Sequence, residues 1–143
     1  LRKNSGEIGD DVRLRLTQGA LTSASDYIKA QRARTEFNRQ IKEALNRFDI
    51  LLSPTNPVGA PKIEEQTIIV GDSLQSTPSL MPRLTRPHNI CGIPTISIPC
   101  GFTQQKTPIG LQIGGRPFDE KLILQVAHAY ESATDWGQMR PIL

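Results

Sequence analysis

The sequence lacks the features that would place it in a membrane, in a disulfide scaffold or around a metal. No apolar run approaches 18 residues and no charged-then-apolar leader is present, which predicts neither a membrane span nor a secretory signal. Cys91 and Cys100 flank an extended segment longer than the roughly 7 Å allowed between the Cα atoms of a disulfide, so two thiols in a reducing cytoplasm are expected. His88 and His128 have no ligand partner at helical spacing. We therefore expect no metal and no cofactor.

Aromatic residues and unbalanced charge are also scarce, which argues against nucleic-acid binding. Aromatics make up 5% of the chain, and 17 Lys and Arg stand against 14 Asp and Glu for a net charge of +3. The basic residues concentrate in segment 29–47, where Glu36 lies four residues after Arg32 and Glu43 four after Arg39. Pairs at this spacing stabilise a solvated helix face, and interleaved acids oppose the counterion release that phosphate binding requires. A phosphate-binding stripe is the weaker alternative, and no nucleic-acid partner is expected.

Hydrophobic periodicity predicts helices in the first third of the chain. Residues 10–18 form a short helix in this prediction, although their alternating apolar positions also fit a strand. Ser23, with Asp26 three residues later, resembles a capping box that begins a longer helix. A strand over residues 49–53 follows, and its continuous apolar residues suggest burial on both faces. The expected core face of the long helix consists of Tyr27, Ala30, Phe37, Ile41, Ala44 and Phe48.

The last third predicts strand, hairpin, strand and helix. Residues 95–99 and 109–113 alternate β-branched and apolar positions between prolines and glycines, and the polar linker 104–107 is short enough to make them neighbours. Gly114 and Gly115 end the second strand, and a helix begins at Asp119. Its apolar face should pack on a sheet. That face consists of Leu122, Ile123, Val126, Ala127 and Tyr130.

The stretch between these parts, residues 54–88, reads as irregular. It contains six of the 11 prolines, and only residues 67–70 suggest a short exposed strand. A structureless segment of this length inside a compact domain is usually functional or disordered. We therefore look for binding residues at its end.

The segment 89–136 resembles the C-terminal part of the amidase signature family. The resemblance extends upstream to the strand and proline-rich loop at residues 48–55 and to the helix before them, and so covers nearly the whole chain. It implies an α/β fold in which helices pack on a mixed sheet, with residues 1–143 forming the C-terminal part of a single amidase domain. The matching residues are Asn89, Gly92, Pro94, Ile96, Pro99, Gly101, Pro108, Gly110, Leu111, Gln112, Gly115, Pro117, Phe118, Asp119, Glu120, Ala127, Glu131 and Trp136.

The resemblance implies cleavage of a carbon–nitrogen amide bond by a serine nucleophile, working with a Lys and a cis-Ser. Those three residues belong to the family's N-terminal half, in a glycine- and serine-rich stretch. The nearest string here, residues 71–76, lacks the consecutive small residues that let a backbone wrap around a reacting carbonyl. We therefore expect no catalytic residue in this chain. Its first residue, Leu1, is consistent with a missing N-terminal half, as it is with processing.

The same resemblance points to substrate-binding residues before Asn89. The segment leading into that residue lines the acyl side of the pocket in the family, and matching spacing indicates Ser79, Pro82 and Arg86. A guanidinium at position 86 could clamp a substrate carboxylate through two parallel hydrogen bonds, although an exposed Arg before a proline is also ordinary surface. Cys91 is expected near this pocket as a small buried side chain.

Two other functions remain open at the level of sequence. The tRNA-dependent amidotransferases have a catalytic chain that resembles this one too, but Pro82 stands where that chain has an acidic residue, which favours a stand-alone amidase acting on a small amide. A non-catalytic binding module is a second alternative. An independent hydrolase using His88 is a third, weakened because no nucleophile elbow surrounds Ser97 or Cys100. A cytoplasmic location and no membrane partner are expected, and a homodimer stays open.

Overall fold

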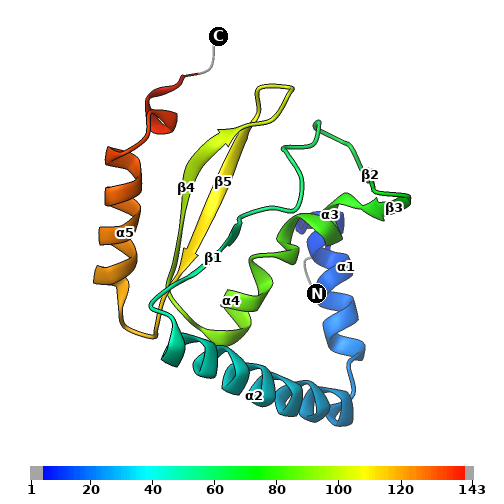
Figure 1. The fold of residues 1–143 in the computed structure, drawn as a ribbon. Helices are drawn as coiled ribbons and strands as arrows, with labels where there is room; N and C mark the ends of the chain where they lie inside the picture. The colour runs from blue at the N-terminus through cyan, green and yellow to red at the C-terminus, as the bar shows by residue number, and fades with distance from the viewer. Residues whose placement is uncertain (1–4, 141–143) are drawn as a thin grey trace. The chain divides into compact units, whose positions relative to one another are not determined.

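The computed structural model describes residues 5–140 as helices joined to two small antiparallel sheets (Figure 1). The chain divides into two compact units, Leu1–Phe37 and Asn38–Leu143. The first holds the 3-10 helix η1 (Ser5–Glu7), helix α1 (Asp10–Leu21) and the beginning of helix α2 (Ala24–Arg47). The second holds the rest of α2 and all strands of the described residues, and it contains the candidate site.

The first unit confirms both helices predicted from periodicity. Residues 10–21 are helical, so the ambiguous alternation resolves as α1, which has Asp10 and Asp11 in its first turn. The Ser23 hydroxyl accepts a hydrogen bond from the Asp26 backbone N–H at 3.1 Å and donates one to the Asp26 carboxylate at 2.7 Å. That reciprocal contact satisfies one of the unpaired N–H groups at the start of α2. The predicted capping box is therefore present, with the hydroxyl taking both roles.

Helix α2 is solvated along most of its length. Arg39 and Glu43 form an ion pair one turn apart, as predicted. The predicted core face is only partly correct, because the side chain of Tyr27 is 60% exposed and that of Phe48, which follows the helix, is 56% exposed. The buried residue is Leu45, which the prediction missed, with Ile41 and Ala44 half-buried beside it.

The main sheet contains β1 (Leu51–Pro54), β4 (Thr95–Phe102) and β5 (Pro108–Gly114) in the order β1-β5-β4. The β4–β5 hairpin confirms the predicted pair and closes through Thr103 and Thr107, whose hydroxyls lie 2.7 Å apart. A mixed sheet was expected, whereas both strand pairs of this sheet are antiparallel. A parallel pair needs a crossover connection, and a short hairpin loop cannot supply one. The α/β class itself is confirmed.

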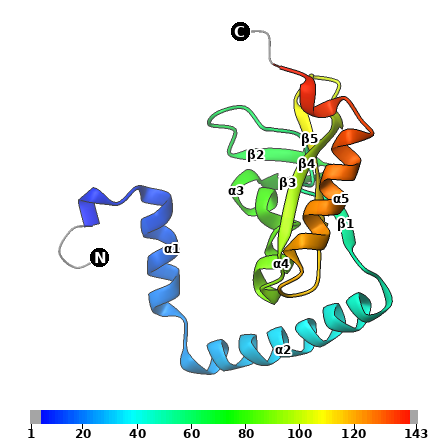
Figure 2. The ribbon, with the colours of Figure 1, turned by 90° about the vertical axis from the view of Figure 1, so that its left-hand side faces the viewer.

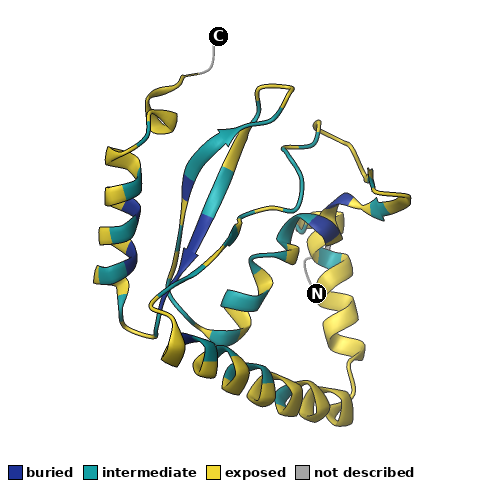
Figure 3. Ribbon diagram, viewed as in Figure 1, coloured by how far each residue is buried: buried dark blue, intermediate teal, exposed yellow. Residues whose placement is uncertain are grey.

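The core lies between this sheet and α5 (Glu120–Ser132), as the spacing of its apolar face predicted. Figure 2 shows α5 alongside β4 and β5, and Figure 3 shows buried residues on the facing surfaces of helix and sheet. Ile113 is fully buried at the centre of a cluster with Ile98, Ile123 and Ala127. After α5, the 3-10 helix η3 (Trp136–Gln138) brings the Trp136 ring within 6.2 Å of the Phe102 ring.

The segment predicted as irregular contains more regular structure than its prolines suggested. The predicted strand β2 (Thr67–Val70) is confirmed and pairs with β3 (Ser73–Ser76). Three short helices then follow, α3 (Thr77–Leu80), η2 (Met81–Arg83) and α4 (Arg86–Cys91). Their prolines stand in the first turn of each helix, where the missing N–H costs nothing and the fixed φ is already helical. Reading these prolines only as helix breakers was therefore wrong.

Candidate functional site

The two faces of the main sheet differ in chemistry because polar and apolar residues alternate along its strands. Ile96, Ile98, Leu111 and Ile113 point to the face that α5 covers. The opposite face carries polar and small residues at the intervening positions, and we call it the polar face. Its residues are Leu51, Ser53, Thr55, Thr95, Ser97, Pro99, Gly110, Gln112 and Gly114.

A row of hydroxyl groups crosses the polar face from β1 to β4. The Thr55 and Ser97 hydroxyl oxygens lie 2.5 Å apart, although these residues belong to strands on either side of β5. They can meet because Gly110 lies between them on β5. A Cβ at that position would come within 2.6 Å of the Thr55 hydroxyl oxygen and 2.7 Å of that of Ser97. The glycine therefore makes room for a polar bridge over the middle strand.

Gln112 is the centre of the polar face. Its side chain is 3% exposed, and its amide nitrogen lies 3.1 Å from the Ser53 hydroxyl, 3.1 Å from the Leu84 carbonyl and 2.9 Å from His88 Nδ1. The amide carries two N–H groups, so three acceptors share two donors. This buried amide ties β1, β5 and the segment before α4 into one hydrogen-bonded network.

His88 places α4 on the polar face. Its ring packs on the backbone of Gly114, where a Cβ would meet the His88 ring carbon Cδ2 at 2.9 Å. Burial lowers the pKa of His88 from its usual 6.5, and a hydrogen bond to the Leu84 backbone partly opposes this shift. The ring is therefore neutral near pH 7, when Nδ1 can accept the hydrogen bond from Gln112. This His is engaged in holding the helix rather than in activating a hydroxyl.

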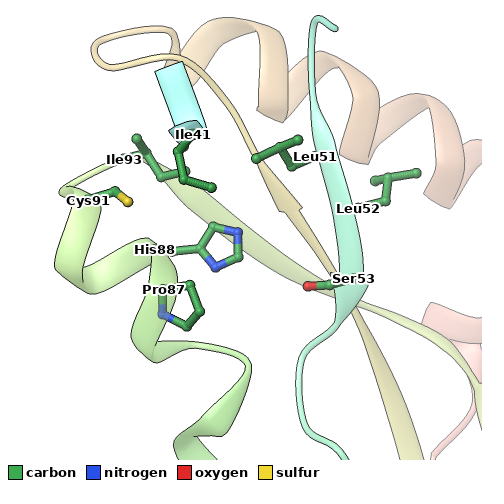
Figure 4. A pocket seen from close by; sticks show the side chains of 8 residues that line it. All are labelled: Ile41, Leu51, Leu52, Ser53, Pro87, His88, Cys91 and Ile93. Carbon is green, nitrogen blue, oxygen red and sulfur yellow. The ribbon is translucent and has the colours of Figure 1, made fainter. Parts of the chain in front are cut away.

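Beside His88 lies a small, mostly apolar cavity of about 120 Å³ between α4 and the edge of β1 (Figure 4). Figure 4 shows the His88 ring pointing from α4 toward β1, and Leu51 and Leu52 pointing to opposite sides of their strand. The lining residues are Ile41, Leu51, Leu52, Ser53, Pro87, His88, Cys91 and Ile93. Cys91 is thus a half-buried wall residue, as expected, and neither it nor Cys100 takes part in a disulfide.

The three predicted substrate-binding residues fall on the short helices that lead to this network. Ser79 is exposed on α3, Pro82 is half-buried in η2, and Arg86 is exposed as the first residue of α4. No hydrogen bond of the described residues joins these three side chains to one another, and the Pro82 carbonyl accepts a bond from the Thr85 hydroxyl at 3.2 Å. They share a short helical segment, and His88 lies two residues beyond Arg86.

Sequence reasoning missed Gln112, Ser53, Thr55 and Ser97 as members of one site. The signal was present in the alternation Thr-Ile-Ser-Ile over residues 95–98, which had been interpreted only as evidence for a strand. Its polar positions define one face. Strand order decides which other residues share that face, and strand order is not written in local sequence.

A second long-range contact fixes the turn before α5. The Arg116 guanidinium donates to the Leu45 carbonyl at 2.9 Å, to the Phe48 carbonyl at 3.3 Å and to the Asp49 carboxylate at 3.1 Å. A cation at this place satisfies carbonyls at the end of α2 and complements the helix dipole. Arg116 therefore holds the start of β1 in register with the end of β5.

The described residues contain no group of three or more His, Cys, Asp or Glu side chains that could hold a metal ion. Among residues 5–140 there is also no helix long and apolar enough to cross a bilayer. The Ser97 hydroxyl contacts Thr55 and no lysine or histidine in this part of the chain. The arrangement can bind and orient a polar ligand, and it holds no paired nucleophile and base.

These features define part of an α/β protein whose sheet carries a polar, ligand-facing side. The profile of the family described as Amidase matches residues 2–124, and the chain belongs to this family. The GatA-type component of the glutamyl-tRNA(Gln) amidotransferase of Thermodesulfovibrio yellowstonii is 38% identical over 148 residues, covering 100% of this chain and 30% of that protein. An amidase of Pseudomonas putida is 38% identical over 134 residues, covering 93% of this chain and 28% of that protein.

Solved structures agree on the fold. A crystal structure of an amidase superposes with a TM-score of 0.86 at 24% identity, covering 93% of this chain and 30% of that one. The chain therefore spans a little under a third of the length of the proteins that it matches.

Proposed function

We propose that this chain is the C-terminal part of an amidase signature enzyme that cleaves a carbon–nitrogen amide bond with a serine nucleophile located elsewhere in the parent polypeptide. The chain supplies scaffold and one wall of the substrate pocket. The observation that carries this proposal is the attachment of α4 to the polar face through His88 and Gln112. This attachment presents Arg86, at the first turn of the same helix, on a fixed support.

Two further observations support a wall rather than a complete catalytic centre. The hydroxyls of the polar face are bonded to each other or to Gln112, and none contacts a general base within residues 5–140. In addition, the chain covers only 28–30% of the length of the relatives with which it aligns. Most of the parent enzyme, including its nucleophile, would then lie outside these residues.

Within that function, Ser79, Pro82 and Arg86 contact a small amide substrate on its acyl side. The parent is a stand-alone amidase in this proposal and is located in the cytoplasm. The alternative parent is the GatA-type component of a glutamyl-tRNA(Gln) amidotransferase, and relatives of both kinds are 38% identical to the chain. Overall identity does not separate them. Pro82 favours the amidase, since its side chain cannot hydrogen-bond an amino group.

The test of this proposal is the kinetics of Arg86 variants in the full-length parent. A guanidinium that clamps a substrate carboxylate contributes charge-assisted hydrogen bonds, so Arg86→Ala should raise KM for carboxylate-bearing amides by about 10-fold or more. Amides without a carboxylate should keep their KM. Arg83→Ala is the matched control, because Arg83 is an exposed arginine on the neighbouring helix η2. Equal effects of the two substitutions, or glutamine-dependent amidation of glutamyl-tRNA with no hydrolysis of small amides, would contradict it.

A further inference from the structure

Strand β1 has a hydrogen-bonded neighbour on one side only. It pairs with β5, and the order β1-β5-β4 places it at an edge of the described sheet. The Thr55 N–H donates to the Gly110 carbonyl at 2.8 Å. Because inward and outward groups alternate along an antiparallel strand, the groups of Leu51 and Ser53 also point to β5. The N–H and C=O of Leu52 and the C=O of Pro54 therefore point to the open edge.

This edge differs from one that is protected against further pairing. It carries no charged side chain, and the Leu52 side chain is 59% exposed. Phe48, just before the strand, is 56% exposed. Natural sheets protect a free edge with charges, bulges or covering segments, whereas an apolar uncovered edge favours pairing with another strand. Pro54 lacks an N–H, so pairing along this edge would end there.

The cavity described above lies beside the same edge. It separates β1 from α4, and apolar side chains from both elements line it, among them Leu51 and Ile93. A strand added at β1 would pass along this opening, about 4.8 Å from β1, with alternate side chains directed under α4. Edge and cavity thus form one surface that accepts an extended segment with apolar residues at every second position.

We propose that an extended segment of the longer parent polypeptide pairs with the free edge of β1 and fills the cavity between β1 and α4. This rests on the proposed function only in requiring a parent longer than the chain. The relatives leave about 70% of their length outside the matched region, since the chain covers 30% and 28% of them. A segment of the same polypeptide also has a high effective concentration at this edge.

A second copy of the chain fits this edge less well. Two β1 strands would pair through Leu52 alone before reaching Pro54, so the four-residue strand offers a short ladder. A stable dimer buries roughly 1,000 Å² or more, which such a ladder does not provide. The parent segment is therefore the occupant to which we commit.

Hydrogen exchange in the full-length parent tests the pairing directly. The Ser53 amide, bonded to β5, should exchange slowly both in the parent and in the 143-residue chain. The Leu52 amide should be protected in the parent, slowed on the order of 1,000-fold or more as expected for opening of a stable domain, and should exchange rapidly in the chain alone. Rapid exchange of the Leu52 amide in the parent would overturn the proposal. Protection in a parent that lacks amidase activity would support this proposal while contradicting the proposed function.

A pair of leucine substitutions tests the surface itself. Leu52→Lys places a charge on the β1 edge, whereas Leu124→Lys places one on the outward side of α5, where Leu124 is 55% exposed against 59% for Leu52. In the parent, only Leu52→Lys should accelerate amide exchange along residues 51–54 and lower the thermal midpoint. Equal tolerance of both substitutions counts against the proposal. So does a dimer of the isolated chain that Leu52→Lys converts to a monomer, because the occupant would then be a second copy.

Discussion

At the scale of single residues, the side-chain amide of Gln112 carries more of the structure than any other polar group in the described part of the chain. It is buried on β5 and serves acceptors from β1 and from the segment before α4. Replacement by Leu keeps the volume but leaves these acceptors without their donor. We expect Gln112→Leu to lower the free energy of unfolding by about 2 kcal/mol or more, as measured by urea denaturation. Gln125→Leu, on an exposed position of α5, should change it little, and an equal loss would refute the role of Gln112.

His88 makes the stability of the protein depend on pH. Burial lowers the pKa of His88 below 6.5 in the folded state, so the unfolded chain binds more protons between the two values. Its contribution to stability is therefore complete above pH 6.5 and is lost as the pH falls toward the lower, folded value. Urea midpoints measured between pH 7.5 and 5 should decrease, and the decrease should be smaller in His88→Gln. His128→Gln, on an exposed position of α5, is the control and should keep the full decrease.

At the scale of elements, close contact between the end of β5 and α5 holds the core together. A Cβ at Gly115 would lie 2.6 Å from the Ile123 side chain, which belongs to the buried cluster. Gly115→Ala should therefore push α5 away from the sheet and lower the free energy of unfolding by about 1–3 kcal/mol, measured by thermal or urea unfolding. Gly137→Ala is the matched change, because no atom lies within 4 Å of a Cβ there. Tolerance of alanine at position 115 would show that α5 is loosely seated.

The short helices α3, η2 and α4 show how an element can escape prediction. Pro78, Pro82 and Pro87 suggested an irregular segment, yet each stands in a first helical turn. Helices this short cannot form alone, because nucleation costs more than so few hydrogen bonds return. They persist here because Gln112 and the His88 ring attach α4 and the residues before it to the sheet. Their existence therefore depends on tertiary contacts.

At the scale of the whole molecule, the open edge of β1 and the lack of a nucleophile–base pair point the same way. A chain that is part of a larger enzyme should be inactive alone, since stabilising a transition state requires groups that it does not hold. We expect the 143-residue chain to show no hydrolysis of simple amides in a discontinuous ammonia-release assay, while the full-length parent turns them over. Turnover by the chain that a Ser97→Ala or Thr55→Ala change abolishes would contradict the proposed function.

The sequence by itself determined the elements whose signals are local. The β4–β5 hairpin and the apolar face of α5 follow from spacing alone, because alternation and helical periodicity report which side of an element is buried. The cap at Ser23 and the absence of a glycine- and serine-rich catalytic stretch are equally readable in the letters. Residues matched to a family motif gave Ser79, Pro82 and Arg86 as candidates, and they stay predictions.

Only the tertiary structure decided which polar residues form a site. Ser53, Ser97 and Gln112 lie far apart in the sequence and share one row because β5 runs between β1 and β4. The same strand order leaves Leu52 exposed, although continuous apolar residues suggested burial on both faces. Local sequence encodes the face of a strand but not its neighbours, since pairing depends on long-range contacts. The polar face and the open edge therefore appeared only once the chain was folded.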